Sequence, residues 1–204
     1  MKRQLKTFSI KKMNLLSVAM VLVCLAAALP LNLLVFNGSF TEHAVISMVA
    51  MFAGYIVLIV LHEAIHALAA LLFAKAKPKD IEFGAIWAQL MFYCHVKKPM
   101  TAKEYRAVLI MPLIFTGILP LIAATVWGNP YLIMLFSLLV SGAAGDVVMF
   151  RETLKYPKSQ LIEDHPKAPA YYLVFEEGAE LPPDFVEVTD EQEQQLLDMM
   201  NRKK

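Results

Sequence analysis

Residues 54–77 read GYIVLIVLHEAIHALAALLFAKAK. Three ionisable side chains, His62, Glu63 and His66, lie inside a hydrophobic run that ends only at Lys75. A run of this length is typical of a helix that crosses a membrane, where ionisable groups are costly to hold. The segment therefore predicts a transmembrane helix that carries a functional site.

The spacing of the two histidines suits a metal ion. Positions i and i+4 of an α-helix share one face, so His62 and His66 can both bind Zn²⁺ at about 2.0–2.1 Å. Glu63 points to a neighbouring face, from which its carboxylate can reach a water molecule activated by the metal. We predict His62 and His66 as zinc ligands and Glu63 as the catalytic base. The alternative is a chance pattern in a helix that buries polar groups, which three ionisable residues in one hydrophobic run disfavour.

A catalytic zinc ion also needs a third protein ligand and an open position. The last hydrophobic run offers Asp146, which is the only charged residue of 138–150 and follows the small residues 141–145. Small residues let two helices approach closely, so we expect His62, His66 and Asp146 to form the metal shell. Alternatively, Asp146 is a carboxylate at the membrane edge without a metal role. The competing third ligands are His95, which has the strongest case, and Cys94, Glu152, Asp164 and His165.

Hydrophobic residues make up 58% of the 204-residue chain and charged residues 18%. Four hydrophobic runs are each long enough to cross about 30 Å of hydrocarbon at about 1.5 Å per residue. They cover residues 15–36, 44–74, 107–127 and 131–150. We predict an all-α integral membrane protein with a four-helix membrane domain at 15–150, after a basic N-terminal segment at 1–14 and before a C-terminal segment at 151–204. A cleaved signal peptide is an alternative for the first run, but that run is longer than a usual signal-peptide core.

The basic residues indicate the orientation of these helices. All 19 Lys and Arg residues fall before the first run, between the second and third, or after the fourth. The loops at 37–43 and 128–130 contain none. Because basic residues favour the cytoplasmic side, both termini are expected in the cytoplasm. Orientation of the first helix also explains the basic N-terminal segment without a nucleic-acid partner.

Three further segments carry structural expectations. Residues 81–96, IEFGAIWAQLMFYCHV, are too short to span a bilayer and rich in β-forming residues, which favours a re-entrant or interfacial β-hairpin. An amphipathic surface helix is the alternative there. Pro112 and Pro120 can each kink the third helix and leave carbonyl groups that need other partners. The apolar patch at 171–175 is a candidate strand, and the acidic tail at 176–198 is expected to be a solvated surface with a short terminal helix.

Together these motifs resemble the "putative zincin peptidase" family of small bacterial membrane proteins and, more distantly, the site-2 intramembrane metalloproteases. The resemblance is carried by His62-Glu63-Ala64-Ile65-His66, Phe92-Tyr93-Cys94-His95, Thr101 to Arg106, Gly145-Asp146 and Asp164-His165-Pro166. It implies a zinc site open toward the cytoplasm of a bacterial cell membrane, completed by a helix-four Asp, and a β segment that holds substrate as an added strand. Site-2 proteases usually present this Asp in Leu-Asp-Gly, whereas Gly145 precedes Asp146 here.

The expected function is therefore a zinc metallopeptidase that hydrolyses peptide bonds of a membrane or membrane-proximal substrate. Its expected partners are the lipid bilayer and a membrane protein or peptide. Two alternatives are a membrane protein that uses the polar cluster for ion or proton passage, and a zinc-stabilised scaffold without turnover. Only two of the predicted helices carry ionisable residues, which disfavours transport, and a base beside the metal disfavours a purely structural site.

Overall fold

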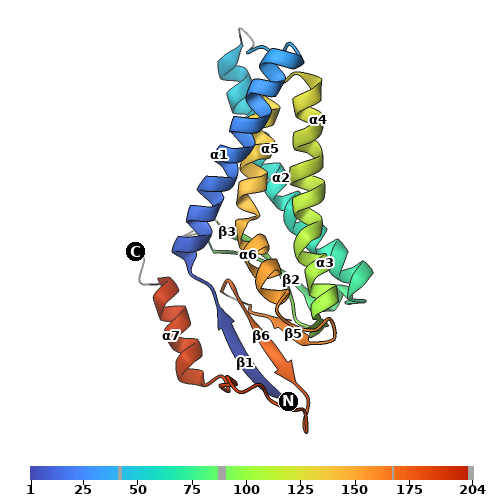
Figure 1. The fold of residues 1–204 in the computed structure, drawn as a ribbon, viewed down its shortest axis with the longest axis vertical. Coiled ribbons are helices and arrows are strands. Elements are labelled where there is room, and N and C mark those ends of the chain that lie inside the picture. The colour runs from blue at the N-terminus through green and yellow to red at the C-terminus, as the bar shows by residue number, and fades with distance from the viewer. Residues whose placement is uncertain (41–42, 87–90, 167, 202–204) are drawn as a thin grey trace.

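The apolar runs form an elongated helical bundle that stands over a small β layer in the computed structural model (Figure 1). The structure describes residues 1–40, 43–86, 91–166 and 168–201. The bundle consists of α1 (Ile10–Val35), α2 (Ala44–Phe73), α3 (Ala102–Pro112), a π-helical segment (Leu113–Ile118), α4 (Leu119–Trp127), α5 (Pro130–Gly142) and α6 (Ala144–Thr153). Three stretches are long and apolar enough to cross a membrane, or four if the bent pair α5–α6 is one span. These spans indicate a membrane protein.

The fourth predicted helix is in fact two helices. α5 and α6 meet at Ala143 with a bend of 41°. Just before the bend, the Ser141 hydroxyl donates to the carbonyl of Leu138 at 2.8 Å. Such a bond to a carbonyl of the preceding turn often bends a helix. The sequence predicts that the small residues 141–145 let a neighbouring helix come close. It does not predict that the helix bends there.

The third apolar run stays continuous through its two prolines. Its π-helical segment follows Pro112 directly, and the Leu119 N–H donates to the carbonyl of Ile114, five residues earlier. Single π-helical turns are rare and frequently occur at functional sites. The kink expected at the prolines therefore takes the form of a widened turn, which includes the buried residue Thr116.

The predicted hairpin is present as the antiparallel strands β2 (Ile81–Ile86) and β3 (Met91–Val96). Its residues 87–90 lie outside the described part of the chain. A second, four-stranded antiparallel sheet has the order β1-β6-β5-β4. Its strands are β1 (Lys2–Thr7), β4 (Met100–Thr101), β5 (Leu161–Asp164) and β6 (Ala170–Phe175). The chain is mostly helical, as the expected all-α class requires, and the candidate strand at 171–175 is present as part of β6. The four-stranded sheet corrects that class, because strands far apart in the sequence pair in a way that no local pattern reveals.

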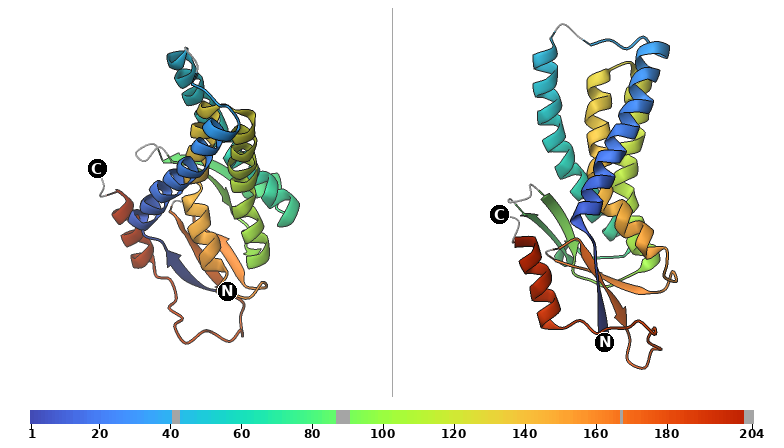
Figure 2. Two further views of the ribbon diagram at one scale, coloured as in Figure 1. Left: turned by 45° about the horizontal axis from the view of Figure 1, so that its top comes forward. Right: turned by 60° about the vertical axis from the view of Figure 1, so that its left-hand side comes forward.

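Both ends of the chain meet in this sheet. β1 pairs with β6, so Lys2 lies opposite Phe175 and Thr7 opposite Ala170. After β6 the tail runs along β1, where the Val188 N–H donates to the Arg3 carbonyl. The tail ends in the expected short helix α7 (Asp190–Asn201), beside the sheet in Figures 1 and 2.

The main core lies where α2 and α3 reach the β layer. An alanine-rich face of α2, including Ala69 and Ala70, packs there with Tyr105 of α3 and with Ile162 and Tyr171 of the sheet. Small side chains let the backbones of α2 and α3 come close. The other half of α2 diverges from α1 and exposes apolar side chains on its surface, which suits contact with lipid (Figure 2). The polar residues of α2 therefore lie at the end of the helix that is packed in protein.

Gly117 should be required for the contact between the π-helical segment and α5. A Cβ atom at Gly117 would lie 2.9 Å from Val140 Cγ2 on α5, and a β-branched side chain has little freedom to move away. We expect Gly117→Ala to cost about 1–3 kcal/mol of stability, as overpacking does. A Cβ at Gly142 would meet nothing within 4 Å, so Gly142→Ala is the control and should not destabilise. Thermal unfolding in detergent measures both, and equal melting temperatures would contradict the packing described here.

Candidate metal centre

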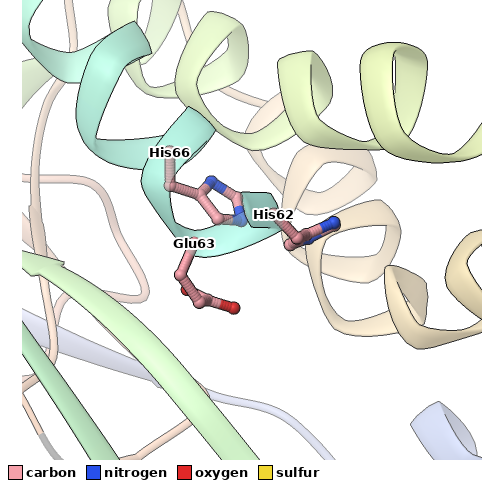
Figure 3. A group of neighbouring side chains, drawn as sticks. All are labelled: His62, Glu63 and His66. Atoms are coloured by element: carbon pink, nitrogen blue, oxygen red, sulfur yellow. The ribbon is translucent and has the colours of Figure 1, made fainter. Parts of the chain in front are cut away.

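The His-Glu-x-x-His residues lie on α2 with the geometry that their spacing predicts. Potential ligand atoms of His62, Glu63 and His66 all fall within 4.8 Å of one another. Figure 3 shows the imidazoles one helical turn apart, with the Glu63 carboxylate directed to a different side. Both histidines are 8% exposed, so they are largely shielded from solvent. The group could bind a metal ion.

Asp146 reaches both imidazoles with one carboxylate oxygen. Its Oδ2 lies 3.2 Å from His62 Nε2 and 3.4 Å from His66 Nε2. Four ligands at about 2.0–2.1 Å around a tetrahedral zinc ion are separated by about 3.3 Å, so the observed distances fit the edges of such a shell. The bend between α5 and α6 contributes to this contact, because it places Asp146 in the first turn of α6. The structure thus brings together the three residues that the sequence singled out as metal ligands.

The other ring nitrogen of each histidine is held by α3 or the π-helical segment. His66 Nδ1 lies 3.0 Å from the carbonyl of Val108, which can only accept a hydrogen bond. His62 Nδ1 lies 3.0 Å from Thr116 Oγ1, whose hydroxyl hydrogen is donated to the carbonyl of Pro112 at 2.8 Å. In the neutral state both imidazoles therefore carry their proton on Nδ1, which leaves a lone pair on each Nε2.

This arrangement provides a chemical test of whether a metal fits. With both imidazoles neutral, the lone pairs of two ring nitrogens lie 3.2 Å and 3.4 Å from the same carboxylate oxygen. Three acceptors so close repel unless a cation or a proton lies among them. Nitrogen and carboxylate donors are the ligands of catalytic zinc sites. The donor set therefore fits zinc, with His62, His66 and Asp146 as the residues that would hold it.

A cavity of about 370 Å³ surrounds these side chains. Besides the three candidate ligands and Glu63, its walls come from several elements. They include Asn14 and Ser17 of α1, Tyr55 and Ile59 of α2, Phe92 and Cys94 of β3, Tyr105 of α3, and Asp164 of β5. The hairpin and the sheet are therefore part of the site, although their strands lie outside the membrane-spanning helices.

Strand β3 passes beside Glu63. The backbone of Cys94 lies close to the Glu63 carboxylate, and both residues line the same cavity. The Cys94 thiol lies in the same cavity, and its pKa is raised to about 12 by burial first and then by the negative charges of Glu63 and Asp164. This places the candidate base between the metal centre on α2 and the edge of the hairpin.

The competing third ligands have other contacts. His95 Nδ1 lies 3.2 Å from Asp164 Oδ2, and the hydroxyl of Tyr105 donates to Asp164 Oδ1 at 3.0 Å. Glu152 pairs with Lys155 at 2.8 Å, and His165 Nε2 lies 4.0 Å from Glu193. Among the described residues, Asp146 is the carboxylate for which contacts to both candidate histidines are found. Thr116 and the Val108 carbonyl are not among the residues predicted from the sequence. Pro112 is the signal for the Val108 carbonyl, because a proline four residues later cannot donate to it.

Comparison with known families identifies the group to which this chain is related. A family model whose description is "Putative zincin peptidase" matches residues 55–161, more than half of the chain. The chain belongs to this family. No curated protein and no solved structure matches it.

The match covers the His-Glu-x-x-His segment, the hairpin and Asp146. Membership in the zincin peptidase family confirms the resemblance read from the sequence and implies zinc as the cofactor. The motif Asp164-His165-Pro166 lies beyond the matched residues. The more distant resemblance to site-2 proteases stays a prediction.

Alkylation of Cys94 should report on the charge of Glu63. In metal-free protein carrying Cys24→Ser, a thiol pKa near 12 leaves about one thiol in 10⁴ ionised at pH 8, so iodoacetamide should react slowly. Glu63→Gln removes a negative charge that raises this pKa, so the rate at pH 8 should increase. Glu82→Gln on β2 is the control and should not change it. Equal rates with and without the Glu63→Gln substitution would contradict the proximity of the two side chains.

Proposed function

We propose that this protein is a membrane-embedded zinc metallopeptidase that hydrolyses peptide bonds of a membrane or membrane-proximal polypeptide. The observation that carries the proposal is that Asp146 Oδ2 lies 3.2 Å from His62 Nε2 and 3.4 Å from His66 Nε2, with Glu63 beside them. Membership in the zincin peptidase family supports the same reaction class.

Glu63 is the proposed general base. When bound, zinc lowers the pKa of a water molecule and polarises the carbonyl of the scissile bond. The Glu63 carboxylate takes the proton from the attacking water and delivers it to the leaving amine. This carboxylate lines the cavity beside Cys94 of β3. The half-buried site limits competing water, which strengthens the electrostatic contribution of these groups.

The hairpin offers a place for an extended substrate. Among the described strands β3 pairs only with β2, so its other edge has no strand partner, and Phe92 and Cys94 of β3 line the cavity. An extended peptide added to that edge would expose its peptide bonds, which a helical substrate shields. Cavity-lining residues on both α1 and α2 support access from the bilayer as well as from the β layer.

The sheet supports a topology with four crossings and both termini in the cytoplasm of a bacterial cell. Because β1 pairs with β6, residues 2–7 and 170–175 must lie on the same side of the bilayer. An even number of crossings satisfies this requirement, so the bent pair α5–α6 is proposed to cross as one span. The basic residues flanking the spans favour the cytoplasm for that side.

Glu63→Gln should separate metal binding from catalysis. The variant keeps the side-chain size and the proposed ligands but lacks a base, so we expect wild-type zinc content and a loss of cleavage of about 10²- to 10⁴-fold. Zinc is measured on protein purified in detergent, and cleavage by mass spectrometry of new peptide termini in proteoliposomes loaded with membrane proteins. Glu82→Gln, on the exposed hairpin strand, is the matched control and should cleave normally.

The same series tests the ligands. His62→Ala and Asp146→Ala should both lose zinc affinity. Normal zinc affinity in Asp146→Ala beside lost affinity in His62→Ala would show that another residue completes the shell. Zinc binding by every wild-type preparation without any cleavage would favour a scaffold over an enzyme.

Cysteine labelling tests the topology. Single cysteines replace Lys2, Ser39 or Glu177, which are exposed, in a background without Cys24 and Cys94. In intact cells a membrane-impermeant maleimide should label position 39 and reach positions 2 and 177 only after the membrane is opened. Labelling of positions 2 and 177 from opposite sides would be incompatible with the pairing of β1 and β6.

A further inference from the structure

Pro112 interrupts the hydrogen-bond ladder of α3 beside the metal centre. In a regular α-helix the Val108 carbonyl accepts from the N–H four residues later, but a proline at position 112 has no N–H. The carbonyl accepts instead from His66 Nδ1 at 3.0 Å. The missing helix bond therefore becomes the anchor of one candidate ligand.

The Pro112 carbonyl fixes the orientation of the Thr116 hydroxyl, which contacts the other candidate ligand, His62. Thr116, in the π-helical turn after Pro112, donates its hydroxyl hydrogen to the Pro112 carbonyl at 2.8 Å. The hydroxyl has no second hydrogen, so it can only accept from His62 Nδ1, 3.0 Å away. Thr116 is 2% exposed, which leaves little room for water to replace it.

We infer that Pro112 and Thr116 are positioning residues that fix the tautomer and direction of His66 and His62 toward one metal ion. The inference rests on the proposed ligand set. With each Nδ1 proton committed to α3 or the π-helical turn, each Nε2 presents its lone pair to the point that Asp146 Oδ2 also faces. Outer hydrogen-bond partners of this kind typically contribute about 10- to 100-fold to metal affinity.

Substitutions should separate the two anchors. Pro112→Ala supplies an N–H that competes for the Val108 carbonyl, so His66 loses its acceptor. Thr116→Val keeps the side-chain shape but removes the acceptor for His62. For each variant we expect the zinc dissociation constant to rise about 10- to 100-fold. Thr116→Ser restores the hydroxyl and should restore most of the affinity.

Two matched controls lie in the same run of helix. Pro120→Ala changes the other proline, and Thr125→Val removes a buried hydroxyl that bonds the Leu121 carbonyl in the same way as Thr116 bonds that of Pro112. Both should bind zinc like the wild type. Zinc affinity is measured by chelator competition in detergent, and melting of the metal-free protein reports folding separately.

Comparison with the wild type and His62→Ala decides the outcome. If the wild type binds zinc, His62→Ala loses it, and both Pro112→Ala and Thr116→Val keep normal affinity, the positioning roles are overturned while the metal centre stands. A wild type that binds no zinc overturns both. A third outcome would also overturn the inference. If the loss of zinc affinity correlates with the melting temperature of the metal-free protein across all variants, including Thr116→Ser and the two controls, the residues act through folding alone.

Discussion

The site depends on the close approach of two imidazole nitrogens to one carboxylate oxygen. Asp146 Oδ2 on α6 lies 3.2 Å from His62 Nε2 and 3.4 Å from His66 Nε2 on α2. Ionisable side chains within an apolar helix are costly in free energy to hold in lipid. A divalent cation held by His62, His66 and Asp146 would replace the repulsion between their lone pairs with three favourable contacts. The surrounding helices hold these donor atoms close together.

Several irregular features of the helices position these three donor atoms. A straight α5–α6 helix would carry Asp146 along a different axis, and the 41° bend directs the first turn of α6 at α2. The π-helical turn and Pro112 provide polar partners inside an apolar bundle. Alanines on α2 let α3 approach closely enough for a backbone carbonyl to reach an imidazole. In a regular helix the Val108 carbonyl would accept a bond from its own helix and would not be available to His66.

Features that depend on neighbouring residues could be predicted from the sequence, whereas contacts between distant segments could not. Hydrophobic runs located the helices to within five residues at each end, because burial in lipid is a property of contiguous sequence. The i, i+4 spacing of His62 and His66 fixed their common face in the same way. The four-stranded sheet was missed because β1 finds its partner in β6 at the other end of the chain. Thr116 was missed because a lone threonine in an apolar helix carries no motif.

The pairing of β1 with β6 has a consequence for biosynthesis. The ribosome releases residues 2–7 first, but their partner strand appears only after residue 170. At about 5–20 residues per second, the first strand waits roughly ten to thirty seconds. Strand β5 and the turn after it, which wall the cavity, need that same late partner. The cavity around the histidine pair can therefore be completed only when translation is nearly finished.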